Sequence, residues 1–241
     1  MSSLDTKIAA AAALLERIQT DHTLATLASS LGAEDMVLTD LIARYAPGIS
    51  IFSLDTGRLN PETYDLLAKV QEIYGDKLSL KVFYPQADAL QSYVERNGIN
   101  AFYDSVELRK ACCGIRKVEP LKRALTGQKA WITGMRRQQA VTRADMPFEE
   151  FDADHGLMKF NPLADWSEQE VWKYIHDNNV PYNALHDQHY PSIGCAPCTR
   201  AIAVGEDIRA GRWWWEDASG KECGLHVKNG GATPVKFETK K

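Results

Sequence analysis

Five cysteines are the most reactive side chains in this chain of 241 residues. Cys112 and Cys113 are adjacent, and Cys195 and Cys198 form a Cys-x-x-Cys pair. Four thiolates can hold Zn²⁺ or a 4Fe–4S cluster. Structural zinc sites commonly use two separated Cys-x-x-Cys pairs, so the adjacent pair favours iron–sulfur over zinc. Two other interpretations stay open: a thioredoxin-like redox pair at the Cys-x-x-Cys, and two buried core cysteines at positions 112 and 113.

The fifth cysteine, Cys223, lies outside that set. Lys221 precedes it by two residues and His226 follows it by three, and nearby positive charge raises the thiolate fraction of a cysteine. Gly224 gives the backbone freedom to move the thiol into and out of a site. The pattern predicts a nucleophile, but an exposed cysteine with no role fits the same residues equally well.

Several cations could gather around one polyanionic ligand. Each of them alone is also compatible with a solvated surface charge. The tryptophans at positions 213–215 favour packing or an interface rather than a ligand site. The candidate cations are Lys117, Arg136, Arg137, Arg143, Arg209 and Arg212.

Two loops rich in small residues each follow an expected strand. Residues 29–35 join a strand to a helix, where backbone N–H groups and the helix N-terminus favour an anion. The segment lacks the Gly-Lys-Ser/Thr ending of a Walker P-loop, and alone it also fits an ordinary turn. Residues 54–58 follow the next strand. The candidate substrate-binding residues are Ser29, Ser30, Gly32, Asp35, Leu54, Asp55, Thr56 and Gly57.

Alternating strand and helix patterns must position these residues. Helices are expected up to about residue 19, at 33–45, from Pro61, at 87–96 and at 167–178, the last with a Ser167–Glu170 capping box. Strands are expected at 23–27, 49–54, 78–84, 130–133 and 158–160. This order predicts an α/β fold with a doubly wound, mostly parallel sheet. Ligands bind beyond the carboxyl ends of such strands, where both loops should lie.

Composition limits the classes of function. The chain is 44% hydrophobic and 25% charged with a net charge of −4, so no global positive field calls for nucleic acid. No apolar run is long enough to cross a bilayer, and the start does not resemble a secretory signal. We expect a cytoplasmic protein without membrane partners. Residues 1–204 are expected to form the nucleotide-binding domain, and 205–241 a flexible C-terminal extension.

These motifs, in this order, resemble the thioredoxin-dependent assimilatory reductases of adenosine 5′-phosphosulfate. The similarity runs from about residue 23 to residue 226. One small departure is Leu31, where the family often has a second small residue. The matching segments are SLGAED at 30–35, LDTGRL at 54–59, CCGIRK at 112–117, TGMRR at 133–137, NPLADW at 161–166, GCAPCTR at 194–200, GEDIRAGRWWWE at 205–216 and ECGLH at 222–226.

The resemblance implies a fold of the adenine nucleotide α-hydrolase (HUP-like) type and reduction of adenosine 5′-phosphosulfate to sulfite and AMP. It implies one 4Fe–4S cluster per chain on Cys112, Cys113, Cys195 and Cys198, and a nucleophilic Cys223. The phosphosulfate contacts would be Lys117, Arg143, Arg209, Arg212 and His226, with Arg136 and Arg137 competing for the place of Arg143. With no sixth cysteine, the second thiol must come from thioredoxin or glutaredoxin. The resemblance also implies a dimer or tetramer.

Three alternatives remain. The same fold could reduce the 3′-phosphorylated substrate, or both substrates, although members restricted to that substrate generally lack the four cluster cysteines. A tRNA-thiolating, adenylating enzyme would need a Ser-Gly-Gly-x-Asp-Ser loop, which is absent here, and a basic face, which the net charge of −4 does not suggest. A non-catalytic zinc or iron–sulfur module would leave Cys223 idle.

Overall fold

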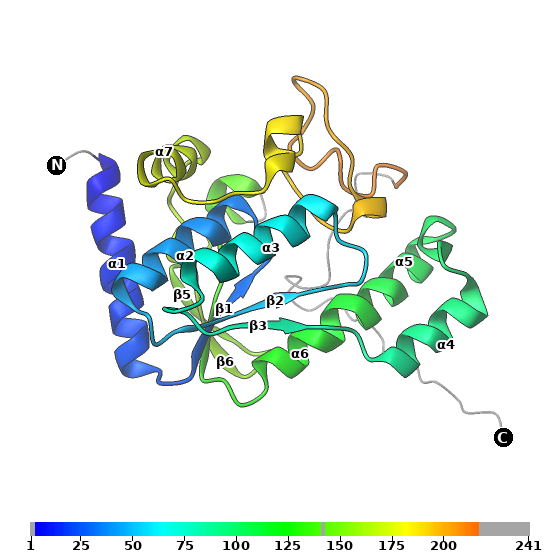
Figure 1. The fold of residues 1–241 in the computed structure, drawn as a ribbon, viewed down its shortest axis with the longest axis horizontal. Helices are drawn as coiled ribbons and strands as arrows, with labels where there is room; N and C mark the ends of the chain where they lie inside the picture. The colour runs from blue at the N-terminus through cyan, green and yellow to red at the C-terminus, as the bar shows by residue number, and fades with distance from the viewer. Residues whose placement is uncertain (1–2, 141–142, 217–241) are drawn as a thin grey trace.

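The computed structural model describes residues 3–140 and 143–216. Within these ranges the chain forms a central sheet covered by helices on both faces (Figure 1). Cys223, His226 and residues 217–241 of the expected extension lie outside the described residues. No helix of the described part is long and apolar enough to cross a membrane.

The sheet has six strands in the order β3-β2-β1-β4-β6-β5. The first five strands in this order pair in parallel, and β5 pairs antiparallel with β6 at the edge. The strand order reverses between β1 and β4, which makes their carboxyl ends the switch point where ligands bind in such folds. The strands are β1 Ala25–Ser29, β2 Ser50–Leu54, β3 Leu80–Phe83, β4 Ala130–Ile132, β5 Glu149–Asp152 and β6 Leu157–Phe160.

Helices α2 and α3 run above the strands in Figure 1, and α6 runs below them. The expected doubly wound, mostly parallel α/β fold is therefore confirmed. A π-helical turn, Gly114–Val118, joins α5 to α6. The helices are α1 Ser3–Asp21, α2 Ala33–Tyr45, α3 Pro61–Tyr74, α4 Ala87–Asn97, α5 Val106–Cys113, α6 Glu119–Leu125 and α7 Glu168–Asn178.

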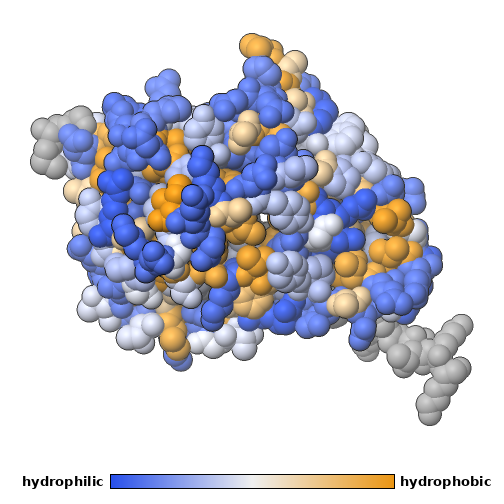
Figure 2. Space-filling view, in the orientation of Figure 1, coloured by the Kyte–Doolittle hydropathy of each residue, from blue (hydrophilic) through white to orange (hydrophobic). Residues whose placement is uncertain are grey.

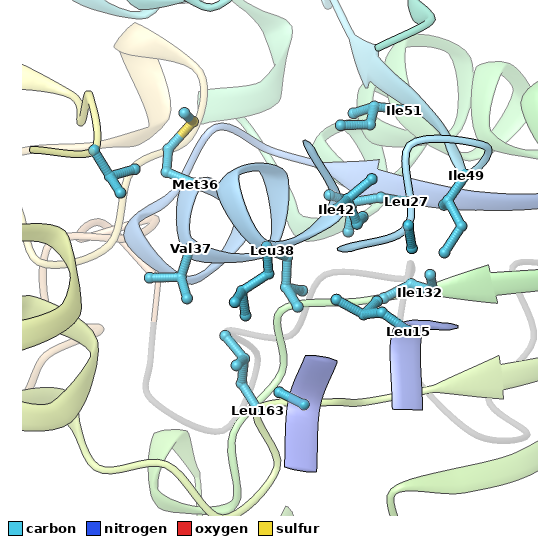
Figure 3. Packing of buried hydrophobic residues seen from close by; sticks show 14 of the residues in the cluster. Leu15, Leu27, Met36, Val37, Leu38, Ile42, Ile49, Ile51, Ile132 and Leu163 are labelled. Atoms are coloured by element: carbon cyan, nitrogen blue, oxygen red, sulfur yellow. The ribbon is translucent and has the colours of Figure 1, made fainter. Parts of the chain in front are cut away.

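The larger core lies between the sheet and the layer of α1, α2, α3 and α7. In Figure 3, Leu38 and Ile42 of α2 lie among Leu15 of α1 and the strand residues Leu27 and Ile132. All five side chains are fully buried. A second cluster packs α6 against the opposite face through Leu121, Leu125 and the strand residue Trp131. The two cores fix the strand ends, and with them the loops that carry the candidate site.

The surface view in Figure 2 is mostly hydrophilic, with several apolar groups, one of which lies over the end of the molecule that α4 and α5 form. Ile99 and Tyr103, in the connection between these two helices, are both exposed. This end also carries Cys112 and Cys113 at the end of α5.

Most predicted elements are present, with small shifts. Helix α2 has the predicted bounds, α3 begins at Pro61, and the Ser167–Glu170 capping box opens α7. Strand β1 begins and ends two residues later than predicted, so Ser29 is the last residue of the strand rather than part of the loop. Strand β5, helices α5 and α6, and the π-helical turn between them are present but were not predicted.

Candidate functional site

A cavity of about 320 Å³ opens at the carboxyl ends of β1, β2 and β4. It brings together residues from the two predicted loops and five of the six candidate cations. Asp55 and Gly57 are not among its lining residues. The predicted site residues that line it are Ser29, Ser30, Gly32, Asp35, Leu54, Thr56, Lys117, Arg143, Arg209 and Arg212.

The loop after β1 is held by Asp35, in the first turn of α2. Its Oδ2 accepts hydrogen bonds from the Ser30 backbone N–H at 2.7 Å and from the Ser30 hydroxyl at 2.6 Å. Burial raises the pKa of the Asp35 carboxyl to about 6, although the hydrogen bonds from Ser30 oppose that shift. The Ser30 amide therefore donates inside the loop. Leu31 takes a left-handed backbone conformation, φ 61°, with its side chain buried in the core.

Gly134, after β4, closes the other side of this loop. A Cβ added at Gly134 would lie 2.4 Å from Asp35 Oδ1 and 2.9 Å from the Cβ of Glu34. The absence of a side chain is therefore what lets the β4 loop approach the start of α2. The two loops form one continuous wall of the cavity.

Of the three competing arginines, Arg143 and Arg136 line the cavity. Arg136 is buried and its Nε donates to Glu34 Oε1 at 2.8 Å, so its charge is paired. Arg137 donates instead to the Met146 carbonyl at 2.8 Å. Arg143 donates to the side chain of Gln139, a neutral partner, at 2.8 Å. Two of the three arginines, Arg136 and Arg143, are therefore placed at the cavity.

The four predicted metal-ligating cysteines converge on a second, smaller cavity. Cys112 and Cys113 end α5, and Cys195 and Cys198 flank a short 3₁₀ turn, Ala196–Cys198. All four thiols are free of disulfides. The other residues lining this cavity are Arg58, Phe102, Arg109, Arg116, Lys117 and Pro197.

The thiols differ in their electrostatic surroundings. Burial raises the pKa of Cys198 to about 12 and also raises the pKa of Cys112. Burial acts on Cys195 in the same direction, but the charge of Lys117 and the hydrogen bond with Thr56 leave its pKa below the usual value. The Thr56 hydroxyl lies 3.2 Å from Cys195 Sγ.

The donor set fits a group that takes several thiolates at once. No three His, Cys, Asp or Glu side chains within the described ranges are arranged to hold a single metal ion. A zinc ion would need its thiolates drawn closely around one centre, whereas a four-iron cluster places each thiolate on a separate iron. The four thiols, three of them buried, are soft ligands that suit either group, and arginines and a lysine surround them.

Lys117 lies in the wall between the two cavities and lines both. It belongs to the π-helical turn that follows Cys113, a kind of turn frequent at functional sites. The neighbouring Arg116 is buried and donates to the Thr56 carbonyl, so this turn is tied to the loop after β2. Arg116 was missed because nothing in the sequence distinguishes it from a surface arginine.

Arg212 and Trp213 connect the cavity with the cysteines from the C-terminal side. Arg212 lines the cavity, and its guanidinium lies 4.9 Å from the centre of the Trp213 ring. The Trp213 backbone N–H donates to the Cys198 carbonyl at 3.2 Å. A Cβ at Gly194 would meet the Arg212 guanidinium, so the present position of this guanidinium depends on the glycine.

Three further lining residues were missed by the sequence analysis: Glu168, Trp172 and His186. The rings of Trp172 and His186 meet edge to face at 5.1 Å. Burial lowers the pKa of His186. These residues come from α7 and the 3₁₀ turn Ala184–Gln188, whose distance in sequence from the two loops hid them.

Known proteins resemble this chain over most of its length. A family model described as "Phosphoadenosine phosphosulfate reductase domain" matches residues 25–201. An adenosine 5′-phosphosulfate reductase from Allochromatium vinosum is 58% identical over 93% of this chain and 87% of its own. The crystal structure of a phosphoadenylyl-sulfate (PAPS) reductase from Candida auris, a phosphate complex, has a TM-score of 0.69 at 27% identity, covering 84% of this chain and 98% of that one.

A more distant structure, the FMN adenylyltransferase of Candida glabrata with FMN and an ATP analogue, has a TM-score of 0.55 at 14% identity. It covers 88% of this chain and 71% of its own, and it shows the fold alone. The family match and the curated relative carry the assignment instead. The chain belongs to the phosphoadenosine phosphosulfate reductase domain family.

Proposed function

We propose that this protein reduces adenosine 5′-phosphosulfate to sulfite and AMP, as an oxidoreductase of sulfate assimilation and cysteine biosynthesis. The observation that carries the proposal is the shared wall at Lys117. One cavity gathers the loops of three strand ends with Arg143, Arg209 and Arg212, and Lys117 joins it to the four cysteines. The name of the relative at 58% identity supports the substrate.

The charge distribution orients the substrate. Because Asp35 accepts the Ser30 amide hydrogen bond and Glu34 pairs with Arg136, the β1–α2 side of the cavity offers an anion neither that amide nor the full charge of Arg136. An anion is unfavourable there. We place the nucleoside on that side, and the phosphosulfate against Lys117, Arg209 and Arg212.

The first chemical step is attack of the Cys223 thiolate on the sulfur of the phosphosulfate. A sulfur–sulfur bond forms, the bond from that sulfur to the bridging oxygen breaks, and AMP leaves with the electron pair. The product on the protein is a thiosulfonate, Cys–S–SO₃⁻. Lys117, Arg209 and Arg212 stabilise the charge that builds on the leaving phosphate. His226, three residues after Cys223 in the sequence, supplies a further donor to the phosphosulfate.

Cys112, Cys113, Cys195 and Cys198 would hold one 4Fe–4S cluster. When bound, it supplies a fixed centre of charge beside Lys117 and need not change its oxidation state. Lys117 then orients the sulfate end of the substrate.

The second step needs a partner thiol. Four cysteines are assigned to the cluster and one to attack, so no cysteine of this chain is left to resolve the thiosulfonate. A thiolate of thioredoxin or glutaredoxin attacks the Cys223 sulfur and releases sulfite. The second thiol of the partner then attacks the mixed disulfide, which frees Cys223 and oxidises the partner.

Mass spectrometry of Cys223 tests the proposal. After incubation with adenosine 5′-phosphosulfate, the peptide with Cys223 should gain the mass of one SO₃ group and lose it again when reduced thioredoxin is added. Lack of the adduct would refute the mechanism and favour a non-catalytic metal-binding module. The Candida auris structure is of a PAPS reductase, so the 3′-phosphorylated substrate is the alternative. Measuring kcat/KM for both substrates decides which of the two the protein reduces.

We also propose a domain organisation, an oligomeric state and a location in the cell for this protein. Residues 1–204 form the nucleotide-binding domain, and 205–241 form the extension that carries Cys223. The chain assembles as a dimer or tetramer, which light scattering of the purified protein would test. It works in the cytoplasm, where a reducing environment keeps five thiols available.

A further inference from the structure

A buried ion pair joins α5 to the C-terminal end of the described chain. Arg109 Nε lies 2.7 Å from Glu216 Oε1, and Arg109 Nη2 lies 2.7 Å from Glu216 Oε2. Only 1% of the Arg109 side chain and 5% of the Glu216 side chain are exposed. Burying two charges costs free energy of folding even when they are paired. Such a pair therefore does more to fix one geometry than to stabilise the folded protein. The two parallel hydrogen bonds define that geometry.

The pair lies beside the cysteine site. Arg109 is three residues before Cys112 on the same helix and lines the cysteine cavity. Its guanidinium lies 4.6 Å from the centre of the Trp213 ring, and the Trp213 N–H donates to the Cys198 carbonyl. Residues 213–216 are thereby held against both cysteine pairs.

Glu216 is seven residues before Cys223. Seven residues span at most about 25 Å when fully extended, so a fixed Glu216 limits where the Cys223 thiol can be. We propose that Arg109 and Glu216 form a positioning pair, which holds the start of the segment carrying Cys223 beside the cysteine site so that the thiol reaches the phosphosulfate. This inference rests on the proposed function.

Loss of the pair would move the nearest anchor within the described residues back toward Trp213. More residues would then separate Cys223 from that anchor, which lowers the effective concentration of the thiol at the substrate. Substrate binding would not change, because neither Arg109 nor Glu216 lines the larger cavity. The pair should therefore affect the rate of the first chemical step and leave nucleotide affinity alone.

A single-turnover experiment separates these effects. Wild-type protein and the Glu216→Gln variant are mixed with adenosine 5′-phosphosulfate and quenched over time, and the fraction of sulfonated Cys223 is measured by peptide mass spectrometry. We expect Glu216→Gln to slow sulfonation about tenfold. Arg109→Lys, which keeps the charge but loses the two-pronged contact, should give an intermediate rate. The Kd for AMP and the rate at which iodoacetamide alkylates Cys223 should match the wild type.

Glu206→Gln is the matched control, because Glu206 forms a comparable two-pronged pair with Arg200 on the surface. This variant should sulfonate Cys223 at the wild-type rate. If Glu216→Gln does not fold, a Gly-Ser-Gly insertion after Gly220 lengthens the tether with the pair intact, and it should also slow sulfonation. A wild-type sulfonation rate in folded Glu216→Gln would overturn the inference. If Glu216→Gln does not fold, a wild-type rate in the insertion variant would overturn it instead. If wild-type protein forms no adduct, the proposed function itself has failed.

Discussion

The hydroxyl of Thr56 lies 3.2 Å from the sulfur of Cys195. Thr56 follows β2 and lines the larger cavity, whereas Cys195 lines the smaller one. The Ala196 N–H also donates to the Arg58 carbonyl at 2.8 Å, so two hydrogen bonds join these loops. The cysteine site and the loop after β2 are therefore in direct contact.

Replacing Thr56 with valine removes the hydroxyl and keeps the side-chain shape. A thiolate ligand that loses a hydrogen bond binds its metal centre less firmly, and such outer partners typically contribute about 10-fold to metal affinity. If the four cysteines hold the proposed cluster, Thr56→Val should lose iron about tenfold faster than wild type under air, as measured by absorbance and iron content. Thr39→Val is the control, since the Thr39 hydroxyl is also buried but donates to the Asp35 carbonyl. Equal rates of iron loss in all three proteins would contradict this role of Thr56.

Lys117 should matter for chemistry more than for folding. Lys117→Met removes the one amine that lines both cavities within the described residues, so the transition-state charge loses a stabilising partner. We expect kcat/KM to fall by about 100-fold or more. Lys122→Met, on the exposed side of α6 and outside both cavities, should retain wild-type activity. The hypothesis fails if Lys117→Met forms the thiosulfonate at the wild-type rate.

The main layers of the fold could be predicted because their signals are local. Period and capping identify α2 and α7, and Pro61 marks the start of α3. The region between α4 and β4 could not be predicted in the same way. Its helices are short, and Cys112, Cys113 and the π-helical turn interrupt their pattern. The edge strand β5 is polar and only four residues long, so it carries almost no alternating signal.

The candidate site was predicted unevenly for a related reason. Residue type and order identify Lys117 and Arg212, both of which line the larger cavity. Arg116 and Glu216 are buried by contacts with residues 60 and 107 positions away, and no local pattern encodes such contacts. Leu31 is a further example of a feature that the sequence does not reveal. It adopts a left-handed backbone conformation because its side chain is anchored in the core.

Gly134 is predicted to be intolerant of a side chain. Gly134→Ala would force its Cβ against Asp35 Oδ1 and displace the start of α2. We expect a loss of about 1–3 kcal/mol in the free energy of unfolding and weaker AMP binding. Gly114→Ala is the comparison: its backbone is helical, with open space at the Cβ, so it should gain up to about 1 kcal/mol. Chemical denaturation and calorimetric titration measure both quantities. Wild-type stability of Gly134→Ala would show that the two loops are not closely apposed.

Asp35 should make stability depend on pH in a defined direction. Burial raises its pKa from 3.8 to about 6, so the folded protein holds the proton more tightly than the unfolded chain does. The contribution of the Asp35 carboxyl to the free energy of unfolding is fully present below about pH 4. It is lost as the pH rises through 6, and the total loss is up to roughly 3 kcal/mol. Asparagine does not titrate, so the stability of Asp35→Asn relative to wild type should increase steadily from pH 4 to pH 7. Thr39→Val, in the same helix, changes no titrating group, and its difference from wild type should stay constant. Thermal unfolding of the three proteins at several pH values measures both trends. A difference in stability between Asp35→Asn and wild type that does not change with pH would mean that burial does not raise the pKa of the Asp35 carboxyl.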